Sequence, residues 1–261
     1  MIIFQNEHTT VFQSALYQTV SVFIETDQAV FLTDPAWLPA EVEEIRKFVH
    51  ERRKGRALYI IFTHSDFDHI IGYKAFEDAI IIASQEFADR PDKEAPLKQI
   101  QEFDTKNYIT RNYEITYPEV DIMIHKDSQS LDIGEASLTF YKAPGHTRDG
   151  LFTIVEPYGI FIAGDYLSDA EFPFVESDYE EYIKTMMKAK TLLEENEISL
   201  LVPGHGTPET LKQKMLNRVR DSHEYLLALK SGGPDVEELS KTYKFFDGLR
   251  GIHEHNLKMA K

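Results

Sequence analysis

Short apolar runs separated by polar turns dominate the first third of the chain. Residues 20–24 and 29–32 are apolar and flank a polar turn at residues 25–28, which predicts a pair of strands. Residues 58–62 and 79–83 are apolar throughout, which is typical of strands buried on both faces. The pattern therefore predicts a sheet that begins early in the chain and contains buried strands.

Helical periodicity follows the first strands and returns toward the C-terminus. Pro39 opens a segment with apolar residues at helical spacing, and Gly55 ends it. We expect a shorter helix at residues 71–76. Ser177-x-x-Glu180 has the spacing of a capping box in front of another helical segment. From Pro208 onward the pattern is again helical.

The remaining strands are expected in the second half of the chain, at residues 121–124, 137–141, 151–155, 159–163 and 198–202. Residues 85–120 contain three prolines and many charges, and we interpret them as an insertion with some helix that could form a lid. Strands early and late, with helices between, favour two packed sheets with helices outside. A length of 261 residues suits a single α/β domain over residues 1–261, with C-terminal helices over 208–261.

Composition narrows the chemistry and the partners. The 28 Lys and Arg against 44 Asp and Glu give a net charge of −16, which argues against a nucleic-acid partner. The dense basic run at residues 52–56 stands at a predicted helix end, where cations favour the helix dipole. The chain has no cysteine, so a metal would need His, Asp, Glu or backbone oxygen.

The chain shows no feature of a membrane or secreted protein. No apolar run reaches the ~18 residues of a membrane span. The first residues lack the basic start and long apolar region of a secretory signal. We therefore expect a cytoplasmic protein without a membrane partner.

Histidine and aspartate follow the predicted buried strands at the point where each strand ends. Residues 63–69 read Thr-His-Ser-Asp-Phe-Asp-His, and three later strands are followed by Gly145-His146, Gly164-Asp165 and Gly204-His205. Loops at strand ends are where α/β proteins bind ligands, and glycine lets the backbone turn sharply there. Each short motif alone is typical of a turn. Their joint occurrence predicts a metal site.

These motifs resemble those of the metallo-β-lactamase-fold hydrolases over about residues 10–210. The resemblance rests on Thr63-His64-x-Asp66-x-Asp68-His69, Gly145-His146-Thr147, Gly164-Asp165 and Gly204-His205-Gly206. Asp34-Pro35 also stands where that family usually carries Asp. The resemblance implies an αββα four-layer sandwich of two mixed β-sheets with helices outside. The family includes β-lactamases, thioesterases, lactonases, sulfatases, phosphodiesterases, nucleases and iron-dependent oxidoreductases.

The resemblance also implies a dinuclear metal centre. Two divalent metal ions would be held, the first by His64, Asp66 and His146, the second by Asp68, His69 and His205, with Asp165 bridging both. It implies that a metal-bound hydroxide attacks an ester, thioester, lactone or phosphoester, so that the partner is a small-molecule substrate. It further implies that Asp68 is catalytic, by orienting the hydroxide or moving its proton.

Asp66 departs from the family, most of whose members carry His at this position. Two divalent ions and three carboxylates, with a bridging hydroxide, make a neutral centre, whereas His would leave one positive charge. Oxygen ligands favour manganese or iron, and zinc also accepts Asp. Alternatively, Asp66 reaches the metal poorly and the first position is weak.

Two other functions stay open beside the hydrolase. Flavodiiron proteins, in the same family, also carry a carboxylate at this position, so an iron-dependent oxidoreductase on the same ligands is one alternative. A non-catalytic ligand sensor that kept the fold is the other. The sequence does not indicate an oligomeric state.

Several further residues have two interpretations. Tyr166 and Ser168 follow Asp165, and Arg148 follows His146, so all three are candidate substrate contacts. The alternatives are that Tyr166 packs within its loop and that Arg148 pairs with Asp149 or faces solvent.

Three other positions are expected to lie outside the metal chemistry. Trp37 is expected to pack in the core or on the surface, although its loop could edge the pocket. His125 lacks a glycine setting and is interpreted as non-ligating. His253 and His255 mimic a metal motif but are expected in a solvated C-terminal tail.

Overall fold

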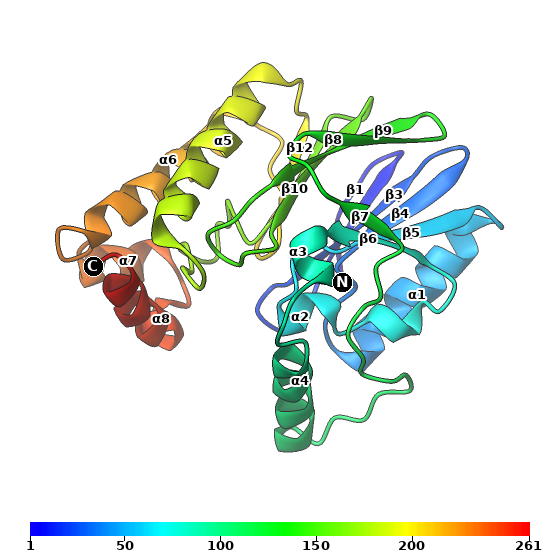
Figure 1. Cartoon of the computed structure of the whole chain (residues 1–261), viewed down its shortest axis with the longest axis horizontal. Coiled ribbons are helices and arrows are strands. Elements are labelled where there is room, and N and C mark those ends of the chain that lie inside the picture. Colours follow the sequence, from blue (N-terminus) through cyan, green and yellow to red (C-terminus); the bar gives the residue numbers. More distant parts are fainter.

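The computed structural model describes residues 1–261 and contains two β-sheets packed face to face, with helices on both outer sides (Figure 1). The seven-stranded sheet has the order β1-β2-β3-β4-β5-β6-β7, and the five-stranded sheet the order β12-β11-β10-β9-β8. Both sheets are mixed, because β4–β7 and the β11–β12 pair are parallel and the other neighbours are antiparallel. The predicted αββα sandwich is confirmed.

The strands of the first sheet are β1 Ile2–Gln5, β2 Thr9–Gln13, β3 Val20–Glu25, β4 Ala29–Thr33, β5 Ala57–Ile61, β6 Ile80–Ser84 and β7 Ile122–Ile124. Those of the second are β8 Gln129–Ile133, β9 Ala136–Lys142, β10 Leu151–Glu156, β11 Ile160–Gly164 and β12 Leu200–Pro203. The helices are α1 Pro39–Arg53, α2 Phe67–Ile70, the 3₁₀ turn Tyr73–Ala75, α3 Gln85–Ala88, α4 Glu94–Lys106, α5 Tyr179–Glu195, α6 Lys212–Leu229, α7 Val236–Thr242 and α8 Phe246–Met259.

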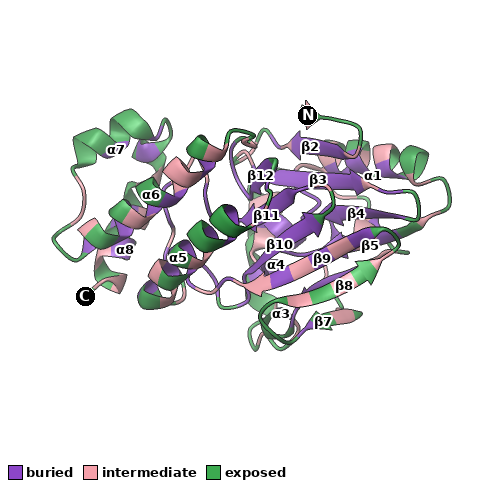
Figure 2. Ribbon diagram, turned by 90° about the horizontal axis from the view of Figure 1, so that it is seen from above, coloured by how far each residue is buried: buried purple, intermediate pink, exposed green.

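Alternation of side chains along the strands divides the core into three layers. In β4, Val30 and Leu32 face α1 while Phe31 faces the other sheet. In β11, Phe161 faces the helices and Ile162 faces the first sheet. Figure 2 shows the central strands buried, whereas the edge strands β7 and β8 carry exposed residues. Because successive strand residues point to opposite faces, these central strands are apolar on both.

The helices cover the two outer faces of the sandwich. α1 packs against the first sheet through Val42, Ile45 and Val49. α5 and α6 cover the second sheet, and α7 and α8 lie beside them at one end of the molecule (Figures 1 and 2). None of the helices is both long and apolar enough to cross a bilayer.

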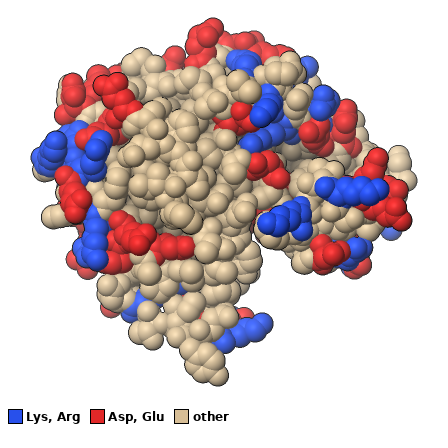
Figure 3. Space-filling view, turned by 180° about the vertical axis from the view of Figure 1, so that it is seen from behind, with Lys and Arg blue, Asp and Glu red and all other residues tan.

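The basic run at the end of α1 forms ion pairs with neighbouring acids. Arg52 and Arg56 both contact Glu25, at 2.5 and 2.6 Å, and Arg53 lies 2.7 Å from Asp78. Lys and Arg side chains also lie among Asp and Glu on the face shown in Figure 3. The run lies at the end of α1, as expected, and its ion pairs with Glu25 and Asp78 are an addition that the sequence did not indicate.

Some predicted elements differ from the structure. Strand β8 was not expected, because as an edge strand it alternates exposed and half-buried residues instead of forming an apolar run. The helix expected at residues 71–76 is replaced by α2 and the 3₁₀ turn Tyr73–Ala75. The capping-box prediction was wrong: the N-cap of α5 is Asp178, whose Oδ1 accepts from the Glu181 amide at 2.9 Å.

The segment expected to be an insertion contains α3, α4 and an irregular stretch that leads to β7. Phe87, Leu97 and Ile100 from this segment are buried in the core beside α1. The segment is therefore anchored to the domain at several points. Its action as a lid stays a prediction.

The C-terminus is not a solvated tail. His253 is 5% exposed, and its Nδ1 lies 3.0 Å from the Tyr225 hydroxyl. The prediction failed because α8 is amphipathic and buries one face, with Phe246, His253 and Asn256, against the core layer next to α5 and α6. His255 is exposed, as expected.

Candidate metal centre

The predicted ligands converge where the two sheets meet. His64 and Asp66 follow β5, and Asp68 and His69 lie in α2 directly after them. The other three ligands, which follow β9, β11 and β12, are His146, Asp165 and His205. The end of β5 is joined to the second sheet by a hydrogen bond from the Leu151 amide to the Thr63 carbonyl, at 2.8 Å.

Two glycines let the ligand loops approach closely. Gly204 precedes His205, and a Cβ there would collide with Asp165 Oδ1. Gly145 precedes His146 with φ of 134°, and a Cβ there would collide with the backbone of Tyr182 on α5. Glycine is therefore required by close packing at both positions, and at Gly145 by backbone conformation as well.

One cluster contains His64, Asp66, His146 and Asp165. Asp66 Oδ2 lies 3.1 Å from His146 Nε2 and 3.6 Å from His64 Nε2. Asp165 Oδ2 lies 3.3 and 3.4 Å from the same two nitrogens. Ligands ~2.0–2.2 Å from a tetrahedral ion are about 3.3–3.6 Å apart, so this spacing fits a single cation.

The second cluster contains Asp68, His69 and His205. Asp68 Oδ2 lies 3.7 Å from His69 Nε2 and 3.5 Å from His205 Nε2. Asp165 again completes the group, with Oδ1 3.1 Å from His69 Nε2 and Oδ2 3.2 Å from His205 Nε2. The Asp165 carboxylate thus faces both clusters, in the position of a bridging ligand.

Several polar atoms at the centre are buried without a hydrogen-bond partner. They are His64 Nε2, His146 Nε2 and Asp165 Oδ1. An unpaired buried polar atom costs ~1–3 kcal/mol, and imidazole nitrogen and carboxylate oxygen are good ligands for divalent cations. The donor set therefore fits two metal ions.

In three of the histidines, the ring nitrogen that faces away from the centre, Nδ1, contacts a carboxylate or a backbone carbonyl. His69 Nδ1 lies 3.1 Å from Asp34 Oδ2, His146 Nδ1 lies 2.8 Å from the Phe174 carbonyl, and His205 Nδ1 lies 2.8 Å from the Tyr17 carbonyl. Nδ1 must donate to these acceptors, so Nε2 is left to bind a metal. Asp34, expected from the sequence near this site, therefore orients a ligand.

Apart from Asp34, sequence reasoning missed the groups that surround these candidate ligands. Thr19 Oγ1 donates to Asp68 Oδ2 at 3.1 Å, and Glu171 Oε2 lies 4.0 Å from His205 Nδ1. The Tyr17 and Phe174 carbonyls carry no side-chain signal at all. These groups reach the centre through tertiary packing, which no local motif indicates.

Opposite charges compete with burial in setting the pKa values of the ligands. Burial lowers the pKa of His205, but the carboxylates of Asp165 and Glu171 outweigh it and raise that pKa to about 10. Burial and the neighbouring His69 lower the pKa of His64, and Asp165 raises it to about 9. Burial raises the pKa of Asp66, but the neighbouring rings of His146 and His64 bring it well below its usual range. Without metal, the centre therefore holds protons on histidine and none on Asp66.

The centre opens to solvent on the Asp66 side. Asp66 has the most exposed side chain of the ligands, at 20%. It lines a cleft of about 440 Å³ together with Arg90, Arg148 and Glu176, and an adjoining cleft of about 330 Å³ shares Asp66, Arg90 and Glu176. The larger cleft has no hydrophobic residue in its lining. A polar molecule could therefore reach the centre beside Asp66.

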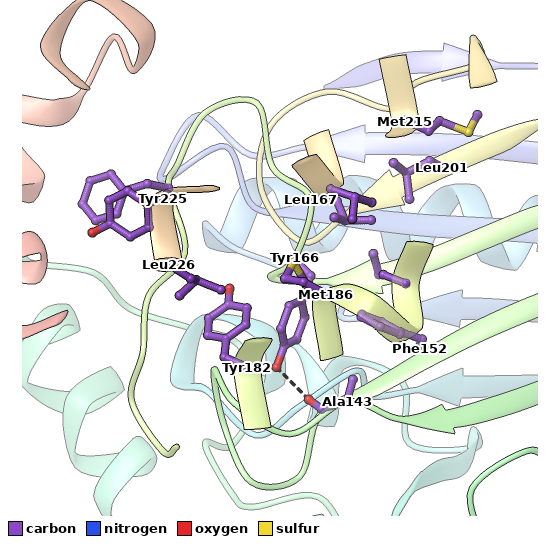
Figure 4. Close-up of a cluster of buried hydrophobic side chains, with 14 of the residues drawn as sticks. Ala143, Phe152, Tyr166, Leu167, Tyr182, Met186, Leu201, Met215, Tyr225 and Leu226 are labelled. Carbon is purple, nitrogen blue, oxygen red and sulfur yellow. Dashed lines mark hydrogen bonds between the residues drawn. The ribbon is translucent and has the colours of Figure 1, made fainter. Parts of the chain in front are cut away.

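The candidate substrate contacts occupy different settings. Arg148 is exposed and lines the larger cleft. The Tyr166 hydroxyl donates to the Ala143 carbonyl at 2.7 Å (Figure 4) and accepts from the His146 amide, so it holds the His146 loop. Ser168 Oγ accepts from the amides of Ala170 and Glu171. Arg148 alone of the three combines exposure with a place in the cleft.

Trp37 and His125 belong to neither cluster of candidate ligands. Trp37 is fully buried in the core beside α1, as one interpretation expected. His125 is exposed, with Nδ1 3.1 Å from Gln85 Oε1, and belongs to neither cluster. Neither residue contributes a ligand.

Comparisons with known proteins agree on the fold. The chain is 23% identical over 190 residues to the metallo-beta-lactamase type 2 of Bacillus cereus, covering 70% of this chain and 65% of that protein. The sec-alkylsulfatase Pisa1 from Pseudomonas sp. superposes with a TM-score of 0.68 at 12% identity, over 91% of this chain and 43% of that one. A metallo-beta-lactamase family protein from Thermus thermophilus gives a TM-score of 0.65 at 16% identity, over 87% and 82%.

The comparison with protein families identifies the family of this chain. The profile of the metallo-beta-lactamase superfamily matches residues 15–205, which is most of the chain and includes all seven candidate ligands. With the two-sheet sandwich and both His/Asp clusters in place, the chain belongs to the metallo-beta-lactamase superfamily.

Proposed function

We propose that this protein is a dinuclear metal-dependent hydrolase acting on an ester, thioester, lactone or phosphoester. One observation carries the proposal: seven His and Asp side chains form two adjoining clusters that share the carboxylate of Asp165. The relatives are similar in fold and family but span different lengths and chemistries, so the substrate is argued from the site.

Each ligand has a distinct part in this proposal. Two divalent cations held by the clusters would supply an activated water and a positive charge facing the carbonyl or phosphoryl oxygen of the substrate, which makes the attached carbon or phosphorus more electrophilic. Asp165 would be shared by the two positions, because its Oδ2 lies beside His64 and His146 of the first cluster and beside His205 of the second. Asp68 is the candidate proton acceptor, since Thr19 fixes its Oδ2 beside the second cluster. Asp66 forms the edge that a substrate would meet first.

The cleft supports a small, polar substrate. Its lining is entirely polar, charged or proline, and its volume of about 440 Å³ falls in the range of small-molecule sites. Arg148 could contact an anionic group there, although Asp66, Glu176 and other acids surround it. The carboxylate of Asp66 favours manganese or iron beside zinc.

Elemental analysis of protein purified without chelators tests the proposal. We expect close to two metal ions per chain and hydrolysis of at least one ester, thioester, lactone or phosphodiester. Asp165→Asn should lose at least one ion and lower turnover by more than 100-fold, while the exposed control Asp132→Asn should change neither. Fewer than about half a metal ion per chain, not restored by adding metals, would favour a non-catalytic sensor.

An iron-dependent oxidoreductase is the second candidate. The observation in its favour is that Asp66 gives the first cluster two carboxylates and two histidines, a set that iron accepts well. It predicts iron as the main metal, oxygen consumption with a reduced partner, and no hydrolysis by the iron-loaded protein. Hydrolysis that follows metal content across zinc, manganese and iron would exclude it.

Asp66→His tests whether Asp66 selects the metal. The exchange replaces an oxygen ligand by nitrogen and adds one positive charge to the centre, so we expect the zinc-to-manganese ratio in the purified protein to rise several-fold. Competition between equal concentrations of the two metals, read by elemental analysis, measures this. An unchanged ratio with unchanged total metal would remove Asp66 from the ligand set.

A further inference from the structure

The C-terminal helix α8 is linked indirectly to the metal centre. The link begins at one buried side chain, Asn256, and passes through the loop that contacts His146. Asn256 is fully buried, and its amide binds the loop that runs between β11 and α5. Its Nδ2 donates to the Pro173 carbonyl at 2.6 Å, and its Oδ1 accepts from the Val175 amide at 2.9 Å. Asn256 is therefore hydrogen-bonded to the backbone on both sides of Phe174.

The residue between these two contacts holds a candidate ligand. The Phe174 carbonyl lies 2.8 Å from His146 Nδ1, and the opposite nitrogen of that ring lies 3.1 Å from Asp66 Oδ2 and 3.3 Å from Asp165 Oδ2. The direction of this carbonyl sets the tautomer and tilt of the imidazole. The Val175 amide, which donates to Asn256 Oδ1, belongs to the same peptide unit as this carbonyl, and Asn256 Nδ2 donates to the carbonyl of the preceding unit. The two hydrogen bonds therefore limit rotation of the Phe174 carbonyl.

The orientation of the Asn256 amide follows from its partners. A proline carbonyl can only accept and a backbone amide can only donate, so oxygen must face Val175 and nitrogen must face Pro173. The second Nδ2 proton reaches the Tyr225 hydroxyl on α6 at 2.9 Å, and that hydroxyl lies 3.0 Å from His253 Nδ1. Both functions of the amide are thus satisfied, and no apolar side chain could replace it.

We propose that Asn256 is a positioning residue for the first metal, acting through Phe174 and His146. This inference rests on the metal centre proposed above. It gives the C-terminal helices, which lie outside the residues that the family profile matches, a part in metal affinity. Because coupling is reciprocal, docking of α8 and binding of the first metal strengthen each other by the same factor.

Asn256→Asp is the sharpest test, because it keeps the size and the acceptor for Val175 but places an oxygen against the Pro173 carbonyl. We expect affinity for one of two metal ions to fall about 10–100-fold, the range for groups that orient ligands. The other ion should bind unchanged, because His69 and His205 are oriented by Asp34 and Tyr17. Titration of chelated protein against a competing chelator, with cobalt as the probe, resolves the two steps by their absorption.

Tyr225→Phe is the matched control. It removes the hydroxyl from Asn256 and His253 but leaves both contacts to residues 173 and 175. We expect lower thermal stability with both cobalt affinities unchanged. Equal affinities in Asn256→Asp and the unsubstituted protein would overturn the inference, because Asn256 would then only anchor α8. An unsubstituted protein that binds no cobalt would instead overturn the proposed metal centre.

Hydrogen exchange on the unsubstituted protein gives a test that does not depend on a variant folding. Adding cobalt to chelated protein should slow exchange in peptides covering residues 172–176 and α8 more than in α1, which packs on the opposite outer face of the sandwich. Equal slowing in α1 and α8 would contradict the coupling, because the metal would then act on global stability alone.

Discussion

At the scale of single residues, the centre depends on side chains that never face the metal positions. Asp34 shows this most clearly: it accepts from the Thr63 amide at 2.9 Å and lies 3.1 Å from His69 Nδ1. One carboxylate thus ties the end of β4 to the loop after β5 and fixes the ring of a ligand. Burial lowers the pKa of His69, but Asp165, Asp68 and Asp34 together raise it well above its usual value.

Asp34→Ala should therefore weaken one metal position without removing a ligand. We expect a 10–100-fold lower affinity for one of the two ions, since groups that orient histidine ligands commonly have that effect. Competition titration with a chelator measures it. Asp121→Ala is the control, because Asp121 accepts from the Ile81 amide at 2.8 Å and belongs to neither ligand cluster. Affinity lost equally in both variants would point to general destabilisation.

At the scale of elements, the segment that leads into helix α5 contacts the loop that carries His146. α5 begins at Tyr179, and the chain just before it carries the amides of Glu176 and Ser177, which donate to the carbonyls of His146 and Gly145. The side chain that caps the start of α5 is Asp178, one residue later than the sequence pattern indicates. Both Ser177 and Asp178 are residue types that cap helices, so the local sequence does not distinguish them. The packing of the chain against the His146 loop selects Asp178.

Asp178→Ala should lower the free energy of unfolding by ~1 kcal/mol, the usual effect of losing an N-cap acceptor. Asp178→Asn should retain most of that stability because Asn also caps well. Glu180→Ala should change stability by less than about 0.5 kcal/mol, as for an exposed position. Urea unfolding followed by circular dichroism measures all three. A larger loss in Glu180→Ala than in Asp178→Ala would restore the capping box at Ser177.

At the scale of the whole molecule, the metal centre joins the two sheets. Ligands from loops of both sheets meet there, and the Val20 amide of β3 donates to the Gly204 carbonyl at 2.7 Å. Without metal, the buried carboxylates are compensated by protonated histidines, among them His64 with a pKa of about 9 and His205 with a pKa of about 10. The stability of the metal-free protein is therefore linked to pH.

The direction of this dependence follows from the raised pKa values. Histidines with a folded-state pKa above the unfolded value of ~6.5 contribute stability below that pH, and the contribution is lost as pH rises through about 9–10. Metal binding needs neutral histidine, so its stabilisation grows over the same interval. The difference in Tm between metal-loaded and chelated protein should widen between about pH 6.5 and 9.5. Thermal unfolding at several pH values measures it, and a constant or narrowing difference would contradict the linkage.

Much of the fold, and the convergence of seven His and Asp side chains in two clusters, could be predicted from the sequence. Metal binding by these seven residues stays a prediction. The apolar runs at β5, β6, β11 and β12 are largely buried on both faces. Their burial could therefore be predicted from their apolar composition alone. The edge strand β8 escaped prediction because one side of it faces solvent. His253 escaped because the apolar face of α8 is meaningful only when a partner surface is known.

The layered fold, the strand-end positions of the candidate ligands and the family can be inferred from the chain's residues alone, because they depend on local periodicity and on residue identity. Which atoms orient the candidate ligands is visible only in the folded chain. Asp34, the Tyr17 and Phe174 carbonyls and Asn256 act through contacts between segments far apart in the chain. Such contacts leave no local pattern, since a backbone carbonyl is the same at every residue and acquires a role only from its direction in the folded chain.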